Sequence, residues 1–200
     1  MKPPLHVLSA ACLALLLTAC GSPSPPPQLY QLRSEPPATA APAVAGATTL
    51  QLMPLTLPEL LERDAILVSQ GSSGVAVVPG HRWAEPLRDA VPRLLRQDLA
   101  LWLGLAQVWG SPLPAGVTVQ RQLRVELLTF QADEGRRAVQ LQARWTLSDP
   151  GGATPVTTRV ELLSAPVQGS AVDALAAAHR VALWRLAEAV AAGVRGRAGP

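Results

Sequence analysis

Side chains that could carry out catalysis or bind a metal are few in this sequence and lie far apart along it. His81 and His179 belong to different segments, and neither sits in a spaced metal motif such as H-E-x-x-H. Ser72 and Ser73 lie between two glycines, which is typical of a turn and lacks the G-x-S-x-G pattern of a nucleophilic serine. We expect His81 to form a hydrogen bond at the entrance to a helix and His179 to lie on a helix surface.

One group of acidic residues could in principle supply acid–base catalysis, but it is flanked by arginines. The acidic residues are Glu59, Glu62, Asp64 and Glu85, and the arginines are Arg63, Arg82 and Arg88. Surface ion pairs explain this pattern, and the sequence has no P-loop or dinucleotide-binding glycine motif. The sequence therefore predicts a protein that is not an enzyme and has no catalytic, cofactor-binding or metal-binding residues.

The residue with the clearest chemistry is Cys20. It follows an apolar run, residues 8–17, which is shorter than the roughly 20 residues of a membrane-spanning helix and has the length of a signal-peptide core. The stretch L-T-A-C-G at residues 17–21 resembles a bacterial lipobox, in which small residues fit signal peptidase II and the thiol takes the diacylglycerol. We predict a signal peptide over residues 1–19 and lipidation of Cys20. The alternative is an ordinary secretory signal that ends near a cysteine by chance.

Cleavage at this point would change what the remaining chain can do. Cys12 would leave with the signal, so the mature chain would have no second thiol for a disulfide or a cysteine metal site. Lys2, the only lysine, would also be lost, which lowers the formal net charge of +3 by one. Positive and negative charges are then nearly equal in number, and this balance does not favour a nucleic-acid partner.

Proline and alanine divide the rest of the chain into a tether and a domain. Residues 20–47 are rich in proline and too poor in large apolar side chains to fold, so they are predicted to be an extended tether. Within it, residues 28–32 alternate apolar and polar and could add a strand to the domain edge. Residues 48–194 are predicted to form a single domain, and residues 195–200 a disordered tail.

The first half of this domain is predicted to contain strands and one long helix. A strand over residues 49–53 and a helical turn over residues 57–63 precede a hairpin of residues 65–69 and 75–78, joined by G-S-S-G. The helix is predicted to open with residues 81–87 and to bury Leu87, Val91, Leu94, Leu95, Leu101 and Trp102. Pro92 lies inside it, where we expect a kink or a fresh start.

The second half has the most regular pattern in the chain. Apolar and polar residues alternate over residues 117–127, 139–147 and 158–162, which predicts an antiparallel meander with one buried face and one wet face. A final helix is predicted to start at the cap Ser170, with Asp173 as its capping-box partner. Its apolar stripe comprises Val172, Leu175, Leu183, Leu186 and Val190. The predicted class is α+β: a mostly antiparallel mixed sheet with two main helices packed on one face.

Candidate contacts with a partner come from two places in this pattern. Trp102 and Trp145 lie on predicted apolar faces and belong in the core, whereas Trp83, Trp109 and Trp184 are less constrained. An exposed tryptophan would indicate a protein or lipid contact. The wet sheet face is either simply solvated or an interaction surface; it comprises Gln120, Gln122, Arg124, Gln140, Gln142 and Arg144. The candidate contact residues are His81, Arg82, Trp83, Arg124 and Arg144.

Several motifs resemble those of a known family. The most specific is H-R-W-A-E-P-L at residues 81–87, preceded by L-P-E-L-L-E-R at residues 57–63. Further motifs are Y-Q-L at 30–32, L-L-R-Q-D-L at 94–99 and V-Q-L-Q-A-R-W at 139–145. Together they resemble the PqiC/YmbA family of auxiliary lipoproteins of ABC-type and MCE-type transport systems. The departures are Leu61 in place of an aromatic residue, Asp64 in place of proline, and the proline-rich linker.

The resemblance implies a non-enzymatic adaptor on the periplasmic face of the outer membrane. It would be held there by its lipid, dock onto an MCE-domain protein of an intermembrane lipid transport system, and support envelope integrity, with a homo-oligomeric ring as a further implication. Gly21 and Ser22 agree with outer-membrane sorting, because the aspartate that retains lipoproteins at the inner membrane is missing. A lipid carrier with an apolar cavity is the alternative, although Ala176, Ala177 and Ala187 are explained more simply by close helix packing.

Overall fold

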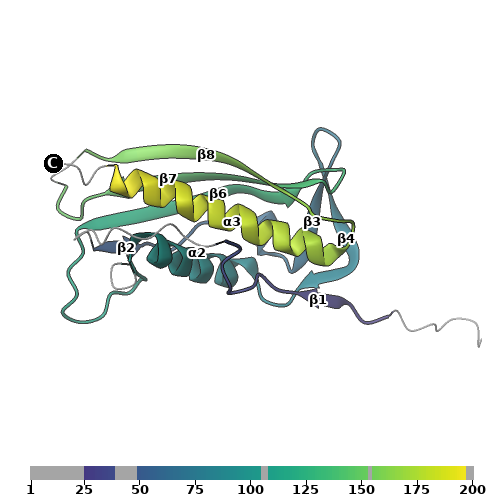
Figure 1. The fold of residues 1–200 in the computed structure, drawn as a ribbon, viewed down its shortest axis with the longest axis horizontal. Coiled ribbons are helices and arrows are strands. Elements are labelled where there is room, and N and C mark those ends of the chain that lie inside the picture. Colours follow the sequence, from purple (N-terminus) through teal and green to yellow (C-terminus); the bar gives the residue numbers. More distant parts are fainter. Residues whose placement is uncertain (1–24, 39–48, 105–107, 153–154, 197–200) are drawn as a thin grey trace, which may run out of the picture.

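The computed structural model describes residues 25–38, 49–104, 108–152 and 155–196. Within these residues the chain forms an eight-stranded sheet, mostly antiparallel, and two long helices. The two helices, α2 (Leu87–Leu103) and α3 (Val172–Arg195), run side by side across one face of the sheet (Figure 1). The predicted fold class is confirmed.

Three long strands form the antiparallel meander that the alternating pattern predicts. They are β6 (Arg121–Ala132), β7 (Ala138–Ser148) and β8 (Thr157–Pro166). β6 begins at Arg121, later than the predicted residue 117, and continues beyond residue 127 through a bulge between Leu127 and Thr129. The extra residue in the bulge shifts the alternation, so that Phe130 and Ala132 become the buried residues at the end of the strand.

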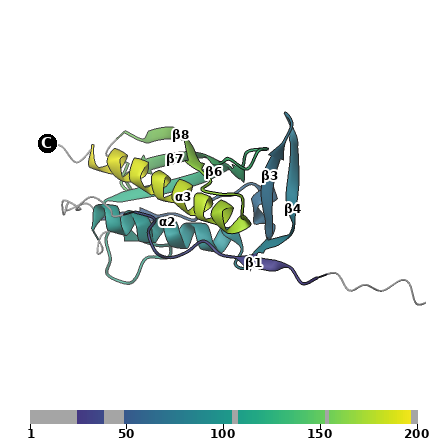
Figure 2. The same cartoon turned by 45° about the vertical axis from the view of Figure 1, so that its right-hand side comes forward.

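The short strands share the other side of β6. β2 (Leu50–Leu52) pairs in parallel with the start of β6, and β5 (Val108–Trp109) pairs in parallel with β2. β3 (Ala65–Gln70) contacts the end of β6 and pairs with β4 (Gly74–Trp83) as the predicted hairpin, whose turn contains Gly71 at φ 59°. β1 (Gln28–Tyr30) adds in parallel to the end of β4, as residues 28–32 suggested. Figure 2 shows this hairpin standing at one end of the molecule.

The helix α2 starts later than the sequence pattern predicts. His81, Arg82 and Trp83 form the end of β4, where they pair with β1, and the helix begins at Leu87 after Pro86. Proline disfavours the helical conformation in the residue before it, so Glu85 separates strand from helix, and the prediction that residue 81 opens the helix is wrong. A single helix runs through Pro92, and the predicted apolar face is buried or, at Leu101, half-buried. A 3₁₀ turn, η1 (Glu59–Glu62), confirms the short helical turn before β3.

The helix α3 covers β7 and β8 and packs against α2. Its cap position is Ala171, without a side-chain hydrogen bond, so the predicted cap by Ser170 is wrong. The buried residues of the predicted stripe face the sheet, and Gly193 lets the helix approach it closely: a Cβ there would lie 2.5 Å from Cη2 of Trp145. Among the described helices, none combines the length and hydrophobicity needed for a membrane crossing.

Candidate functional site

The three predicted contact residues at the end of β4 differ in how far they reach the surface. His81 is half-buried, and its Nδ1 lies 3.0 Å from the hydroxyl of Tyr30 on β1. Arg82 is exposed and donates to the carboxylate of Asp64 at 2.9 Å, as expected for a surface ion pair. Trp83 is only 4% exposed and packs edge-on against His179. The side chain of Trp83 is therefore part of the core and is not a surface contact residue.

Arg124 and Arg144 lie on the sheet face opposite the helices. Arg144 on β7 donates to Glu126 on β6 at 2.7 Å, and both side chains are partly exposed. Arg124 faces Thr146 in the same register and is exposed. The neighbouring glutamines of β6 and β7 are also exposed or half-buried, so the predicted wet face is confirmed in its exposure. We call this surface, the helix-free side of β6, β7 and β8, the uncovered face.

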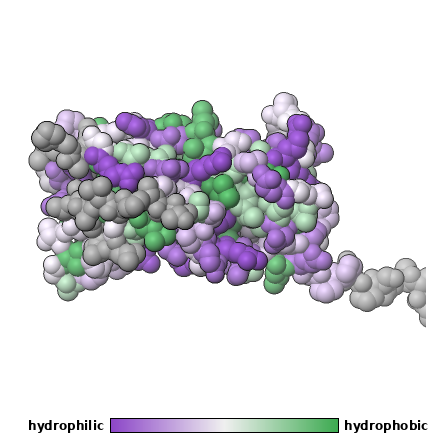
Figure 3. All heavy atoms as spheres, viewed as in Figure 1, coloured by the Kyte–Doolittle hydropathy of each residue, from purple (hydrophilic) through white to green (hydrophobic). Residues whose placement is uncertain are grey.

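The uncovered face also carries apolar side chains, and they lie on β8. The alternation over residues 158–162 implies that Val160 and Leu162 face the core, but they are 49% and 77% exposed. The side of β8 that faces the helices instead carries Glu161, which accepts a hydrogen bond from Nε1 of Trp145 at 3.0 Å. Register with β7 decides this orientation, because Arg159 pairs with the buried Trp145. In Figure 3 a small group of hydrophobic residues appears among hydrophilic ones at the rim where β8 runs.

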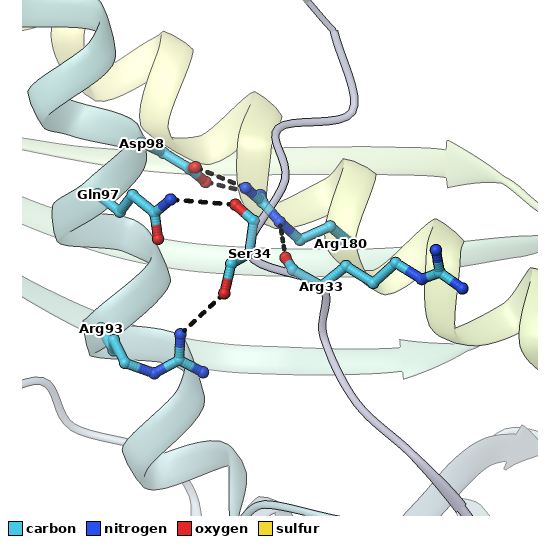
Figure 4. A network of polar contacts seen from close by, with 6 residues as sticks. All are labelled: Arg33, Ser34, Arg93, Gln97, Asp98 and Arg180. Atoms are coloured by element: carbon cyan, nitrogen blue, oxygen red, sulfur yellow. Dashed lines mark hydrogen bonds and ion pairs between the residues drawn. The ribbon is translucent and has the colours of Figure 1, made fainter.

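The segment after β1 is held against the two helices by a polar network (Figure 4). Leu32 is buried in the core, and the carbonyl of Arg33 accepts a hydrogen bond from Nε of Arg180 at 2.8 Å. The carbonyl of Ser34 accepts from Gln97 at 3.1 Å, and its hydroxyl accepts a longer bond from Arg93. Residues 32–34 are therefore part of the folded body and fix where the tether meets it.

The centre of this network is a buried ion pair between α2 and α3. Arg180 donates to both carboxylate oxygens of Asp98, at 2.6 and 2.7 Å, and the two side chains are 4% and 0% exposed. Burial raises the pKa of Asp98, while the hydrogen bonds and charge of Arg180 counteract part of the rise. The sequence pattern alone did not indicate this pair. The sequence did contain a signal, because each residue of the pair lies on the apolar face of its helix. Asp98 lies among Leu94, Leu95 and Leu99, and Arg180 lies near Leu183 and Trp184.

His179, which was predicted to lie on a helix surface, is instead 1% exposed. Its ring packs edge-on between Trp83 and Phe130, with centroids 5.1 and 4.9 Å away, and Nδ1 lies 2.8 Å from the carbonyl of Leu175. Burial lowers its pKa to about 4, so the ring is neutral near pH 7. This side chain behaves as a core residue with one hydrogen bond.

The hollows of the surface are open grooves. One, of about 390 Å³, lies between residues 31–37 and α3 and includes Arg180, Ala176 and Val181. Another, of about 410 Å³, lies between β2 and α2 and includes Arg88, Arg93 and Arg96. The described residues contain no group of three or more His, Cys, Asp or Glu side chains that could hold a metal ion. Cys20, the predicted lipidation site, lies outside the described residues.

Comparison with known proteins gives one family match and several similar structures. The model of the ABC-type transport auxiliary lipoprotein component family matches residues 30–191. A crystal structure of an uncharacterised protein superposes with a TM-score of 0.67 at 17% identity, covering 84% of this chain and 99% of the other. The protein XCC0632 from Xanthomonas campestris superposes with a TM-score of 0.65 at 16% identity, covering 82% and 92%. These two structures share the fold. Among curated proteins, none matches the sequence significantly.

Proposed function

The chain belongs to the family of ABC-type transport auxiliary lipoprotein components, and from this premise we propose that it is a lipid-anchored adaptor of an intermembrane lipid transport system. In this proposal the lipid on Cys20 holds the protein at the periplasmic face of the outer membrane. The folded domain docks onto an MCE-domain protein there, without enzymatic activity, and supports envelope integrity. Assembly of several copies into a ring is a further part of the proposal.

The observation that carries the proposal is the extent of the family match. It begins at Tyr30, within β1, and ends at residue 191, within α3, so it includes the tether junction as well as the sheet and both helices. The junction is where an anchored adaptor needs a defined attachment. The bonds from Arg180 and Gln97 to the backbone of Arg33 and Ser34 supply one.

The part of the chain between Cys20 and the first strand sets how far the domain can stand from its lipid. This part, residues 20–28, would span about 25 Å as polyproline II, at ~3.1 Å per residue. A single acyl chain gives only marginal membrane binding, whereas a multiply acylated cysteine anchors firmly. The domain would thus stay close to one membrane while its uncovered face remains accessible.

The uncovered face is the surface we assign to docking. It combines the charged Arg124 and Arg144 with the exposed apolar Val160 and Leu162, and no described helix covers it. Interfaces that bind specifically join apolar side chains with a polar rim in this way. The lipid-carrier alternative has less support, because the space between sheet and helices is filled by large buried side chains such as Trp145 and Phe130.

The test is chemical crosslinking of the lipidated protein in its native envelope, followed by affinity capture and mass spectrometry. We expect an MCE-domain protein among the main crosslinked partners, with crosslinks on β6, β7 or β8. An Arg124→Glu/Arg144→Glu variant should lose the partner, while Arg137→Glu, which changes an exposed arginine in the β6–β7 turn, should keep it. Recovery of phospholipid without a protein partner would instead favour the carrier. Normal detergent resistance in a clean deletion strain would count against a role in envelope integrity.

A further inference from the structure

The strand β8 leaves one edge of the sheet without a partner strand. Among the described residues it pairs only with β7, along its whole length from Thr157 to Pro166. Its other edge presents backbone N–H and C=O groups, and such an edge is a template for pairing with another strand unless it is protected. The question is which residues present their backbone groups there.

Two hydrogen bonds settle the direction of these groups. Just beyond the strand, the N–H of Val167 donates to the carbonyl of Arg137 at 2.8 Å, so the odd-numbered residues of β8 direct their backbone groups toward β7. The carbonyl of Ser164 accepts from the guanidinium of Arg185 on α3, so the even-numbered residues direct theirs to the open edge. Both hydrogen bonds therefore agree that odd-numbered residues of β8 face β7 and even-numbered residues face the open edge with their backbone groups.

The open part of the edge is short and central. Pro166 has no N–H to offer at the end of the strand, and the carbonyl of Ser164 is already bonded to Arg185. Thr158, Val160 and Leu162 remain, with their backbone groups directed outward. Val160 and Leu162 are also the residues whose exposed apolar side chains lie on the uncovered face.

We propose that two copies of this chain pair antiparallel through β8, about a two-fold axis at Val160. In this register Val160 faces the partner's Val160, and Thr158 faces the partner's Leu162. All of these residues direct N–H and C=O across the contact, which gives roughly six hydrogen bonds.

The charges on β8 fit a second copy in the same register. Arg159 then lies opposite the partner's Glu161 on the helix side of the sheet, and the opposition occurs twice because of the two-fold axis. Both side chains are already positioned by one ring: the guanidinium of Arg159 lies 5.8 Å from the ring centroid of Trp145, and Glu161 accepts from its Nε1. Opposite charges directly across a strand pair are stabilising, and like charges are destabilising.

Pairing of this kind would join the two uncovered faces into one continuous sheet surface. It therefore goes beyond the proposed function, and it can be tested without any transport partner. A two-fold contact of this type closes at two copies, so a larger ring would need a second contact elsewhere.

The first experiment uses thiol crosslinking in the mature lipoprotein with a short bis-maleimide reagent. Residues that face each other in a hydrogen-bonded antiparallel pair have Cα atoms about 5.5 Å apart, so two thiols at this position lie within reach of such a reagent. Val160→Cys should therefore crosslink to its own copy and run at twice the monomer mass. The matched control is Val77→Cys on β4, because Val77 is 51% exposed against 49% for Val160. Equal crosslinking of the two variants, or none with Val160→Cys, would overturn the proposal.

The second experiment measures the mass of the detergent-purified lipoprotein by analytical ultracentrifugation. We expect an even number of copies for the natural chain, because each β8 contact joins two of them. Val160→Arg places two guanidinium groups opposite each other at the axis, so it should break this contact and at least halve the mass, whereas the control Val77→Arg should keep the natural mass. Val160 is exposed, so its replacement should leave the domain folded, which circular dichroism can verify. A monomeric natural chain, or an assembly that survives Val160→Arg unchanged, would overturn the β8 contact. Neither result bears on whether an MCE-domain protein is a partner.

Discussion

The ion pair between Asp98 and Arg180 offers a sharp test of how the two helices and the tether are held together. Its two side chains are almost fully buried, and Arg180 also binds the carbonyl of Arg33. Removing one partner leaves an uncompensated charge in the core, whereas removing both leaves none. The perturbations are Asp98→Leu, Arg180→Met and the double variant.

The two single variants should differ in a way that follows from their ionisation. Asp98→Leu strands a guanidinium that stays protonated, and we expect a loss of about 3–5 kcal/mol in unfolding free energy. Arg180→Met strands a carboxylate whose pKa burial already raises, so it can take up a proton. Its cost should therefore be smaller at pH 5 than at pH 8.

The double variant should recover most of the stability. A well-packed apolar pair is often neutral or stabilising relative to a buried ion pair, so only the bond to Arg33 is lost, worth about 1–2 kcal/mol. For a domain of this size, each kcal/mol corresponds to roughly 2–4 °C in the melting temperature. Asp98→Leu should therefore melt about 6–20 °C lower than the natural chain, and the double variant only a few degrees lower.

The assay is urea unfolding of the three variants and the natural chain, followed by tryptophan fluorescence at pH 5 and pH 8. The interaction energy comes from the double-mutant cycle. Arg93→Met is a suitable control, because its ion pair with Glu85 is partly exposed and should contribute little. If each single variant cost less than 1 kcal/mol, or if the costs simply added in the double variant, the assignment of this pair as the buried link would be refuted.

Three other residues give simpler predictions. Burial lowers the pKa of His179 from 6.5 to about 4. The stability that its neutral ring contributes is therefore fully present above pH 6.5 and falls by up to about 3 kcal/mol as the pH drops toward 4. His179→Gln should remove this component from the pH dependence of urea unfolding. Gly193→Ala should lower the unfolding free energy by about 1–3 kcal/mol, because its Cβ would collide with Trp145, and an unchanged melting temperature would contradict the close approach. Trp102→Phe should cost less than the 3–5 kcal/mol of a large truncation, because Nε1 of Trp102 is buried without a hydrogen-bond partner among the described residues; calorimetry would show it.

The elements that the sequence could predict are those with a local signal. Alternation marked β7, the Gly71 turn marked the β3–β4 hairpin, and the apolar stripes marked α2 and α3, because each pattern repeats within one strand or helix. The boundaries were less secure where a neighbour mattered. Residues 81–83 became strand because β1 pairs with them, and the bulge after Leu127 in β6 shifted the alternation, so that Phe130 and not Thr129 is buried.

The candidate site depended on contacts between residues far apart in the chain. Asp98 and Arg180 are 82 residues apart, and neither helix alone indicates that its one buried charge has a partner. Trp83 and His179 belong to segments far apart in the chain, and their burial follows from the packing of one ring against the other. Contacts of this kind leave no repeating pattern in the sequence, so only the packed structure reveals them.

The strand β8 shows the same division most clearly. Its alternating residues determined by themselves that a strand forms here, because the period of two is a property of the chain. They could not determine which side faces the helices, since either set of side chains fits a half-buried strand. The tertiary structure decided it, because the buried Trp145 on β7 takes Glu161 as its hydrogen-bond partner and so turns Val160 and Leu162 outward.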